Sequence, residues 1–299
     1  MKNRDIGYLK IAYIGGGSRG WAWTFMTDLA LDKEAGGEIR IYDIDIEAAH
    51  HNRIIGNTLP GNWRYTVFET LPEALDGVDF IIISILPGKF AEMRSDVHLP
   101  ERLGVYQSVG DTTGPGGIIR TLRTLPMFAK FAEAIRSYAP DAWVINYTNP
   151  MALCLRALYR VFPEIKALGC CHEVFGTQEL LAEMVGRKLG IEYIERHEIE
   201  VNVLGLNHFT WFSRASWKGH CLMDMYREFS EEFFETGFNF IKSELLNQSF
   251  TCVHRVKFDL FRRFGWIAAV GDRHLAEFMP GEEYLKDMET VRRWGFYLT

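Results

Sequence analysis

A glycine-rich run near the amino terminus is the first place where residue types and spacing point to chemistry. It has the spacing G-x-G-x-x-G, follows an apolar run at Lys10–Ile14 and opens an amphipathic one at Gly20–Leu31. The first glycine of such a motif permits a tight turn, and the second lets the backbone approach a pyrophosphate. The third lets the helix pack on the strand with its positive end toward the phosphates. The pattern predicts a dinucleotide site formed by Gly15, Gly16, Gly17, Ser18, Arg19 and Gly20.

Asp43 gives this glycine run its context. It ends the second predicted strand, Ile39–Tyr42, and lies 23 residues beyond Gly20. An acid at this place can accept hydrogen bonds from the adenosine ribose hydroxyls, and its charge opposes the extra phosphate of NADP. We therefore expect NAD rather than NADP. The alternative is that Asp43 is a turn residue, because Asp45 follows it and aspartate is common in turns.

A second group of residues has the chemistry of metal ligands. Cys171 and His172 close a predicted strand, and Asn207 and His208 follow another strand-like run. A thiolate and an imidazole from two strand ends suit a borderline divalent metal that keeps positions open for substrate oxygens. The alternative is structural, since a buried free cysteine is usually a small apolar residue and a lone histidine is usually hydrogen-bonded in place.

The elements that must position these residues alternate between short apolar runs and longer amphipathic stretches. This alternation predicts βαβ units and a parallel sheet. The run Val78–Leu86 is nearly all apolar, as expected of a central strand that is buried on both faces. A long connection rich in glycine and proline, Pro87–Gly117, leads from it to a predicted helix at Ile118–Tyr138. Long loops after central strands often carry functional residues.

The pattern changes from about Glu198, where alternating residues up to Leu204 predict an antiparallel strand. Further strands are expected at Ala142–Thr148 and Ala167–Cys171, and the aromatic-rich stretch Phe229–Phe264 is interpreted as helical. The expected fold is α/β: a Rossmann-type doubly wound parallel sheet followed by a second α+β domain. The expected domains are residues 1–197, which bind NAD, and residues 198–299, which carry the substrate and metal site.

Composition excludes several classes of protein. The 299 residues carry a net charge of −6, and the basic residues form no long run, which disfavours binding to nucleic acid or an anionic membrane. The five cysteines are odd in number, and the first residues lack the apolar core of a signal peptide. No segment approaches the roughly 18 apolar residues of a membrane span. These features predict a cytoplasmic protein.

Five short motifs resemble those of one enzyme family, and together they extend over nearly the whole chain. The sequence is similar to glycoside hydrolase family 4, the NAD-dependent and metal-dependent glycosidases. The matching stretches are Ile14-Gly15-Gly16-Gly17-Ser18, Thr112-Thr113-Gly114-Pro115-Gly116-Gly117, Asn146-Tyr147-Thr148-Asn149-Pro150, Cys171-His172-Glu173-Val174 and Gly205-Leu206-Asn207-His208-Phe209.

The resemblance implies roles for several residues. The family's metal ligands correspond to Cys171 and His208, which would bind Mn²⁺, and its sugar-contacting asparagine corresponds to Asn149. The stretch that begins with Cys171 resembles the alpha-galacturonidase branch, so the implied substrate is a galacturonide. The implied mechanism is an exception to the two-carboxylate scheme of other glycosidases. NAD⁺ takes a hydride from C3, a base removes the C2 proton, the glycosidic bond is eliminated, water adds at C1 and the hydride returns.

The remaining roles have alternatives. Asp272 is our choice for the C2 base, and the alternative is an N-cap for the helical run that includes His274. His172 is expected to assist the leaving group or to have a structural role beside the metal. The uronate carboxylate needs a cation, for which the candidates are Arg94, Arg273 and His274.

Two further expectations follow from the resemblance. Family members are longer than this chain, which predicts a C-terminal truncation or a natural short form, and a homo-oligomer for the full-length protein. The competing functions are an NAD-dependent 2-hydroxy-acid dehydrogenase of the lactate or malate type and a non-catalytic NAD-binding domain. Cys171 paired with His208 argues against the dehydrogenase, which needs no metal-binding cysteine.

Overall fold

The computed structural model of the chain describes residues 7–239 and 252–298, which form two compact units. Unit 1 comprises residues 1–89 and 121–170, and unit 2 comprises residues 90–120 and 171–299. This division differs from the predicted boundary at residue 198. Helix α7 (Glu173–Leu189) belongs to unit 2 because its buried face, which includes Leu180, Leu181 and Val185, packs in the core of that unit.

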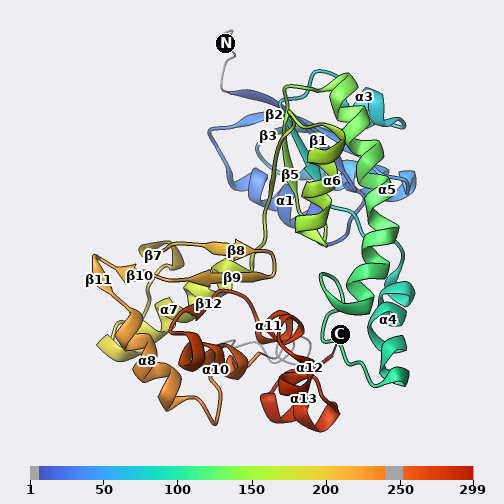
Figure 1. The fold of residues 1–299 in the computed structure, drawn as a ribbon. Coiled ribbons are helices and arrows are strands. Elements are labelled where there is room, and N and C mark those ends of the chain that lie inside the picture. The colour runs from blue at the N-terminus through green and yellow to red at the C-terminus, as the bar shows by residue number, and fades with distance from the viewer. Residues whose placement is uncertain (1–6, 240–251, 299) are drawn as a thin grey trace. The chain divides into compact units, whose positions relative to one another are not determined.

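Unit 1 is built on a six-stranded sheet in which all neighbouring strands are parallel. The strand order is β3-β2-β1-β4-β5-β6, which is the order of the Rossmann fold. The predicted doubly wound α/β fold is therefore confirmed (Figure 1). The strands are β1 (Tyr8–Ile14), β2 (Gly36–Tyr42), β3 (Asn62–Val67), β4 (Phe80–Ile83), β5 (Trp143–Asn146) and β6 (Lys166–Gly169).

Both faces of this sheet are buried, which explains the unbroken apolar run of the central strand. In β4, Ile81 and Ile83 pack in one core cluster with Phe128, and Ile82 packs in another with Met26. Successive side chains of a strand point to opposite faces, so a strand covered on both sides must be apolar throughout. The helices of this part of the chain are α1 (Trp21–Leu31), α2 (Ile46–Thr58), α3 (Leu71–Leu75), α5 (Gly114–Tyr138) and α6 (Met151–Val161); the first residues of α5, up to Arg120, belong to unit 2.

Unit 2 contains two antiparallel sheets of three strands, in the orders β11-β10-β7 and β12-β9-β8. The predicted second α+β domain is confirmed in kind, although its boundary differs. The strands are β7 (Ile199–Val201), β8 (Leu204–Leu206), β9 (Phe209–Phe212), β10 (Ala215–Trp217), β11 (His220–Cys221) and β12 (Ile267–Ala268).

The single strand predicted from Glu198 to Leu204 is wrong, because the chain forms two strands in different sheets there. β7 pairs with β10, whereas β8 pairs with β9. The break follows from the side chain of Asn202, which donates to the Ser213 hydroxyl at 2.8 Å and accepts from the Arg214 amide at 2.8 Å. These side-chain bonds replace ladder bonds and end the first strand.

The helices of unit 2 cover these sheets and carry most of its core. In α10, Val256, Phe258, Leu260 and Phe261 are all buried. The helices are α4 (Phe90–His98), η1 (Leu99–Leu103), α7, η2 (Arg196–Glu198), α8 (Met223–Glu232), α10 (Arg255–Phe264), α11 (Asp272–Phe278), α12 (Gly281–Tyr284) and α13 (Met288–Trp294). The predicted helical stretch Phe229–Phe264 is helical over parts of α8 and over α10, and its residues 240–251 lie outside the described residues.

Two expectations drawn from composition can be compared with the structure. All five cysteines are free thiols. Within residues 7–239 and 252–298, no helix combines the length and the apolar character needed to cross a membrane.

Candidate functional site

The glycine turn in unit 1 follows β1 directly and has the tight geometry that was expected. Gly15 has a φ of +91°, and a Cβ at this position would lie 2.0 Å from the carbonyl oxygen of Ser84. The amide of Gly15 donates to the Tyr42 carbonyl at 2.9 Å, which ties the turn to the end of β2. A side chain at Gly15 would therefore require both a strained backbone and a displaced neighbouring strand.

Asp43 has the turn role that the sequence left as one of two alternatives, and its contact with a ribose stays a prediction. Its Oδ2 accepts a hydrogen bond from the Gly17 amide at 2.8 Å, and its Oδ1 accepts one from the Asp45 amide at 2.9 Å. The carboxylate thus shapes the turn after β2 and also holds the glycine turn. Each carboxylate oxygen has more than one acceptor site, so Asp43 can still accept from ribose hydroxyls.

Asn52 is a further residue of this site, and sequence reasoning missed it. It is buried in α2, and its amide nitrogen donates to the carbonyl oxygens of Gly16 at 2.7 Å and Ser18 at 2.9 Å. The indole of Trp23 in turn donates to the Asn52 side-chain oxygen at 2.7 Å. A polar residue on the inner face of a predicted helix was the only signal available in the sequence.

The packing role expected of the third glycine is wrong. A Cβ at Gly20 would meet no atom within 4 Å, so close packing of the helix does not require glycine there. Gly20 instead forms the N-cap of α1. Arg19, the other predicted cofactor residue, lies with Gly17 in the wall of a pocket of ≈ 240 Å³ beside the turn.

A cluster of ligand-type side chains lies within unit 2. Asp111, His208 and His274 each offer a nitrogen or oxygen atom, and these atoms lie within 4.8 Å of one another. Nδ1 of His208 is 3.7 Å from Oδ1 of Asp111 and 2.9 Å from the hydroxyl of Thr112. The rings of His208 and His274 are stacked with centroids 3.7 Å apart. This donor set of two imidazoles and a carboxylate suits a divalent metal.

Burial and neighbouring charges keep these groups in the forms that bind metals. Burial, together with the neighbouring His274, lowers the pKa of His208 to about 4, so its ring is neutral near neutral pH. Burial alone would raise the pKa of Asp111, but His274 and His208 outweigh it and hold that pKa below its ordinary value. Nδ1 of His274 is buried and has no hydrogen-bond partner among the residues that the structure describes. A metal ion would satisfy that atom.

Cys171 and His172 lie at the beginning of α7, on the border of this cluster. Burial raises the pKa of the Cys171 thiol to about 11, while the side chain of Asn207 hydrogen-bonds the sulfur and opposes the rise. His172 is the N-cap residue of α7; its side chain is 68% exposed, and its Nε2 lies 4.0 Å from Oε1 of Glu173. The structure therefore places the cysteine beside the cluster and leaves the histidine open to solvent.

Glu173 links the two sides of the cluster and was quoted in the sequence only as part of a motif. Its Oε1 lies 3.7 Å from Nε2 of His274, and its Oε2 accepts from the Gly271 amide at 2.8 Å. Burial alone would raise the pKa of Glu173, but the charge of His274 and the Gly271 amide hold it below the ordinary value. Glu173 is therefore a carboxylate that orients the imidazole of His274.

Asp111 was also missed, although it directly precedes the Thr112–Gly117 motif. It lies in the long connection after β4, where functional residues were expected. Its loop is held to α11 by Glu277, whose Oε1 accepts from the amides of Val109 and Gly110 at 2.7 Å each. Arg273 completes the attachment with a bond to the Ser108 carbonyl at 3.1 Å. The same helix that presents His274 thus fixes the loop that presents Asp111.

The role of Asp272 as the C2 base does not agree with its surroundings. The residue is fully buried, and its carboxylate accepts from the amides of Val256 at 3.2 Å and Lys257 at 3.1 Å. A base must reach a substrate proton, whereas this carboxylate faces the first turn of α10. The capping alternative was right in kind but named the wrong helix, since Asp272 is the first residue of α11 and caps α10.

The remaining predicted substrate residues do not join the cluster. Arg94 is exposed on α4, and the contacts that define the cluster do not include it. Asn149 belongs to unit 1, where it is half-buried between β5 and α6. Of the predicted site residues, the structure therefore brings His208 and His274 together and places Cys171 and His172 at the border of their cluster.

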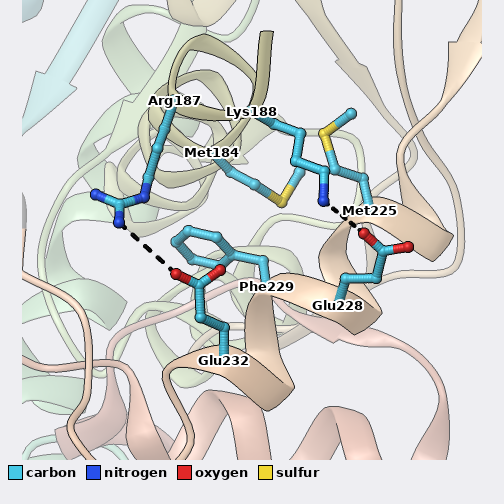
Figure 2. A pocket seen from close by; sticks show the side chains of 7 residues that line it. All are labelled: Met184, Arg187, Lys188, Met225, Glu228, Phe229 and Glu232. Carbon is cyan, nitrogen blue, oxygen red and sulfur yellow. Dashed lines mark hydrogen bonds and ion pairs between the residues drawn. The ribbon is translucent and has the colours of Figure 1, made fainter. Parts of the chain in front are cut away.

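Unit 2 also has a hollow between α7 and α8, which Figure 2 shows from close by. Across it, Arg187 pairs with Glu232 at 3.6 Å and Lys188 pairs with Glu228 at 2.7 Å. These charges satisfy one another at the surface, and none of the predicted site residues lines the hollow. We assign it no function.

Two models of known protein families match successive parts of the sequence. The model of the family 4 glycosyl hydrolases matches residues 10–187, and the model of the C-terminal domain of the same family matches residues 203–295. This chain belongs to the family 4 glycosyl hydrolases. The membership agrees with the resemblance drawn from the five motifs and decides against the lactate or malate type of dehydrogenase.

Individual proteins are also similar to this chain over nearly its whole length. It is 59% identical to an alpha-galacturonidase of Lachnoclostridium phytofermentans over 99% of this chain and 65% of that protein. A Bacillus subtilis structure described as that of a glucosidase, LplD, has a TM-score of 0.93 and 55% identity, over 98% of this chain and 67% of that one. The chain spans slightly less than two thirds of the length of the alpha-galacturonidases that are 59% identical to it.

A more distant solved structure shows the same fold. It is a 6-phospho-alpha-glucosidase from gut microorganisms in complex with NAD and Mn²⁺, with a TM-score of 0.75 and 21% identity, over 95% of this chain and 62% of that one.

Proposed function

We propose that this chain hydrolyses alpha-linked galacturonides with the help of NAD and a divalent metal such as Mn²⁺. The observation that carries the proposal is the 59% identity to an alpha-galacturonidase over 99% of the chain. The chain spans 65% of the length of that relative. We therefore propose the activity both for this chain and for a longer protein that would contain it.

The residues of unit 1 fit NAD. The tight turn that excludes a Cβ at Gly15 is the turn that a pyrophosphate-binding glycine motif requires, and Asp43 lies directly after β2. The residues of unit 2 fit a metal, since the buried Nδ1 of His274 has no hydrogen-bond partner among the described residues. Asp111, His208 and His274 would hold the ion, with Cys171 beside them as a further ligand. When bound, NAD accepts and returns a hydride, and the metal polarises sugar oxygens.

We assign the proton transfer to His172 rather than to Asp272. The imidazole is exposed, and Glu173 lies 4.0 Å from its Nε2. An exposed imidazole can reach a substrate proton, which a general base must do. The same imidazolium can then donate to the leaving oxygen, as we expected for His172.

Recognition of the uronate needs a cation near the site. Arg273 is half-buried in α11, and it is adjacent in sequence to His274. We propose that Arg273 binds the substrate carboxylate, and we assign Asn149 to the sugar hydroxyls. His274 is better explained as a metal ligand than as a carboxylate binder. The proposed ligand is therefore a small-molecule glycoside. Because the chain has a net charge of −6, an anionic glycoside needs a positively charged side chain at the binding site.

We also propose a cytoplasmic location and a homo-oligomer for the longer protein. Five free thiols fit a reducing compartment.

The test is hydrolysis of 4-nitrophenyl alpha-galacturonide in D₂O, with NAD and Mn²⁺ each withheld in turn. We expect turnover only when both are present, deuterium at C2 of the product and no accumulation of NADH. His172→Gln should lower both turnover and C2 exchange by about 10²-fold or more, which is the usual contribution of a general base.

Three results would count against the proposal. Hydrogen retained at C2 of the hydrolysed sugar would exclude proton abstraction. NADH formed in proportion to product would indicate a dehydrogenase, and NAD binding without any turnover would indicate a non-catalytic domain.

A further inference from the structure

A second group of metal-ligand side chains lies in unit 2, formed by Cys252, His254 and Asp272. Each offers one ligand atom, and these atoms lie within 4.8 Å of one another. His254 and Asp272 are buried, and Cys252 is half-buried. The group shares no residue with the cluster of His208 and His274, so the function proposed above leaves it unexplained.

The spacing of two of these atoms is that of zinc ligands. Sγ of Cys252 lies 3.5 Å from Nδ1 of His254. A tetrahedral zinc ion with a Zn–S distance of about 2.3 Å and a Zn–N distance of about 2.0–2.1 Å separates sulfur and nitrogen by roughly 3.5 Å. The pair would therefore need little movement to bind the ion. The same distance fits a simple thiol–imidazole hydrogen bond, so the experiment must separate the two cases.

Backbone amides face the sulfur of Cys252. The amides of Asp272 and His254 both donate to Sγ. Amides directed at sulfur are suited to a thiolate, and a bound metal would supply the remaining stabilisation by displacing the proton.

We propose that Cys252, His254 and Asp272 form a structural site for a divalent metal of zinc type, with water as the fourth ligand. The carboxylate of Asp272 accepts from the amides of Val256 and Lys257 and retains acceptor capacity for an ion. The site joins the residues before α10 to the first turn of α11. It would therefore stabilise the helix that presents His274 without taking part in catalysis.

The experiment counts zinc in a background that lacks the first site, the variant Cys171→Ser with His208→Ala. The chain is loaded with zinc, passed through gel filtration and analysed for metal. We expect about one zinc per chain in this background, and a loss of at least tenfold when Cys252→Ser is added. The matched control adds Cys221→Ser, an exposed cysteine on β11, and should keep its zinc.

A second measurement needs no substitution at the site. In the natural chain, bound zinc should slow alkylation of Cys252 by iodoacetamide at least tenfold, as measured by mass spectrometry of the peptide, and should leave Cys221 unchanged. Cobalt in the background variant should give a thiolate charge-transfer band that Cys252→Ser removes. Equal zinc contents with and without Cys252, or equal alkylation rates with and without zinc, would overturn the proposal and leave a thiol–imidazole hydrogen bond.

Discussion

At the scale of single residues, the carboxylate of Asp43 stabilises two turns at once. Its two oxygens accept from the amides of Gly17 and Asp45, so it connects the glycine turn with the turn after β2. The acid that is expected to select NAD also sets the backbone on which NAD would lie. Replacing it changes both the shape and the charge of the site.

We predict that Asp43→Ala narrows the preference for NAD over NADP by about tenfold or more. The substitution would remove the hydrogen bonds expected with the ribose hydroxyls and the repulsion of a 2′-phosphate. A factor of ten in affinity corresponds to about 1.4 kcal/mol. Calorimetric titration with both dinucleotides gives the ratio. Asp45→Ala is the matched control, because Asp45 caps α2 through the Ala48 amide and should leave the ratio unchanged. A ratio unaltered by Asp43→Ala would contradict the prediction.

At the scale of elements, α11 holds the metal cluster together from one side. His274 enters the cluster, Arg273 bonds the Ser108 carbonyl, and Glu277 binds the amides of Val109 and Gly110. These bonds fix the loop that leads to Asp111. Because one short helix holds both the loop and an imidazole, a disturbance at Glu277 should reach the metal ligands.

Glu277 should also make stability depend on pH. Burial raises its pKa to about 7 from the ordinary 4.5, and the amides of Val109 and Gly110 only partly oppose this. The folded chain therefore binds the proton more tightly than the unfolded chain between these values, and stability must fall as pH rises through this window. We predict that Glu277→Gln reduces the fall in the free energy of unfolding between about pH 5 and pH 8 by roughly 1–3 kcal/mol.

Urea denaturation of the metal-free chain at the two pH values measures this difference. The matched control is Glu179→Gln, at an exposed glutamate on α7, which should leave the pH dependence unchanged. Parallel pH dependence in the natural chain and in Glu277→Gln would mean that Glu277 is ionised in the folded state throughout.

At the scale of the whole molecule, the two cofactors are expected to bind to different units. The glycine turn and Asp43 belong to unit 1, whereas Cys171, Asp111 and His208 belong to unit 2. Cys171 is the first residue of unit 2 after β6, whereas Asp111 comes from the earlier segment of that unit, residues 90–120. Loss of one cofactor should therefore leave binding of the other intact.

We predict that Cys171→Ser and His208→Ala each lower Mn²⁺ affinity by at least tenfold and keep NAD binding within about twofold. Metal content and titration calorimetry measure the two separately. Cys221→Ser is the control for the cysteine, since Cys221 is exposed on β11. Unchanged metal content in both variants would exclude Cys171 and His208 as ligands.

The sequence by itself determined the parts of this protein that depend on local patterns. The apolar runs predicted the parallel sheet because a strand buried on both faces has to be apolar, and the glycine spacing predicted the turn at Gly15 because that backbone excludes a Cβ. Motif residues such as Cys171 and His208 were found in the same way, since each follows a strand end.

Only the tertiary structure decided which residues from distant segments meet. Asp111 and His274 are 163 positions apart in the sequence, yet their side chains lie 3.9 Å apart. The resemblance made Asp272 our choice for the base because the family brings an acid or a tyrosine into the site at that place, but burial against α10 makes it a cap. Local sequence patterns predict how a residue shapes its own turn or helix. They do not predict which distant helix will pack against that residue, because long-range packing of the core determines those contacts.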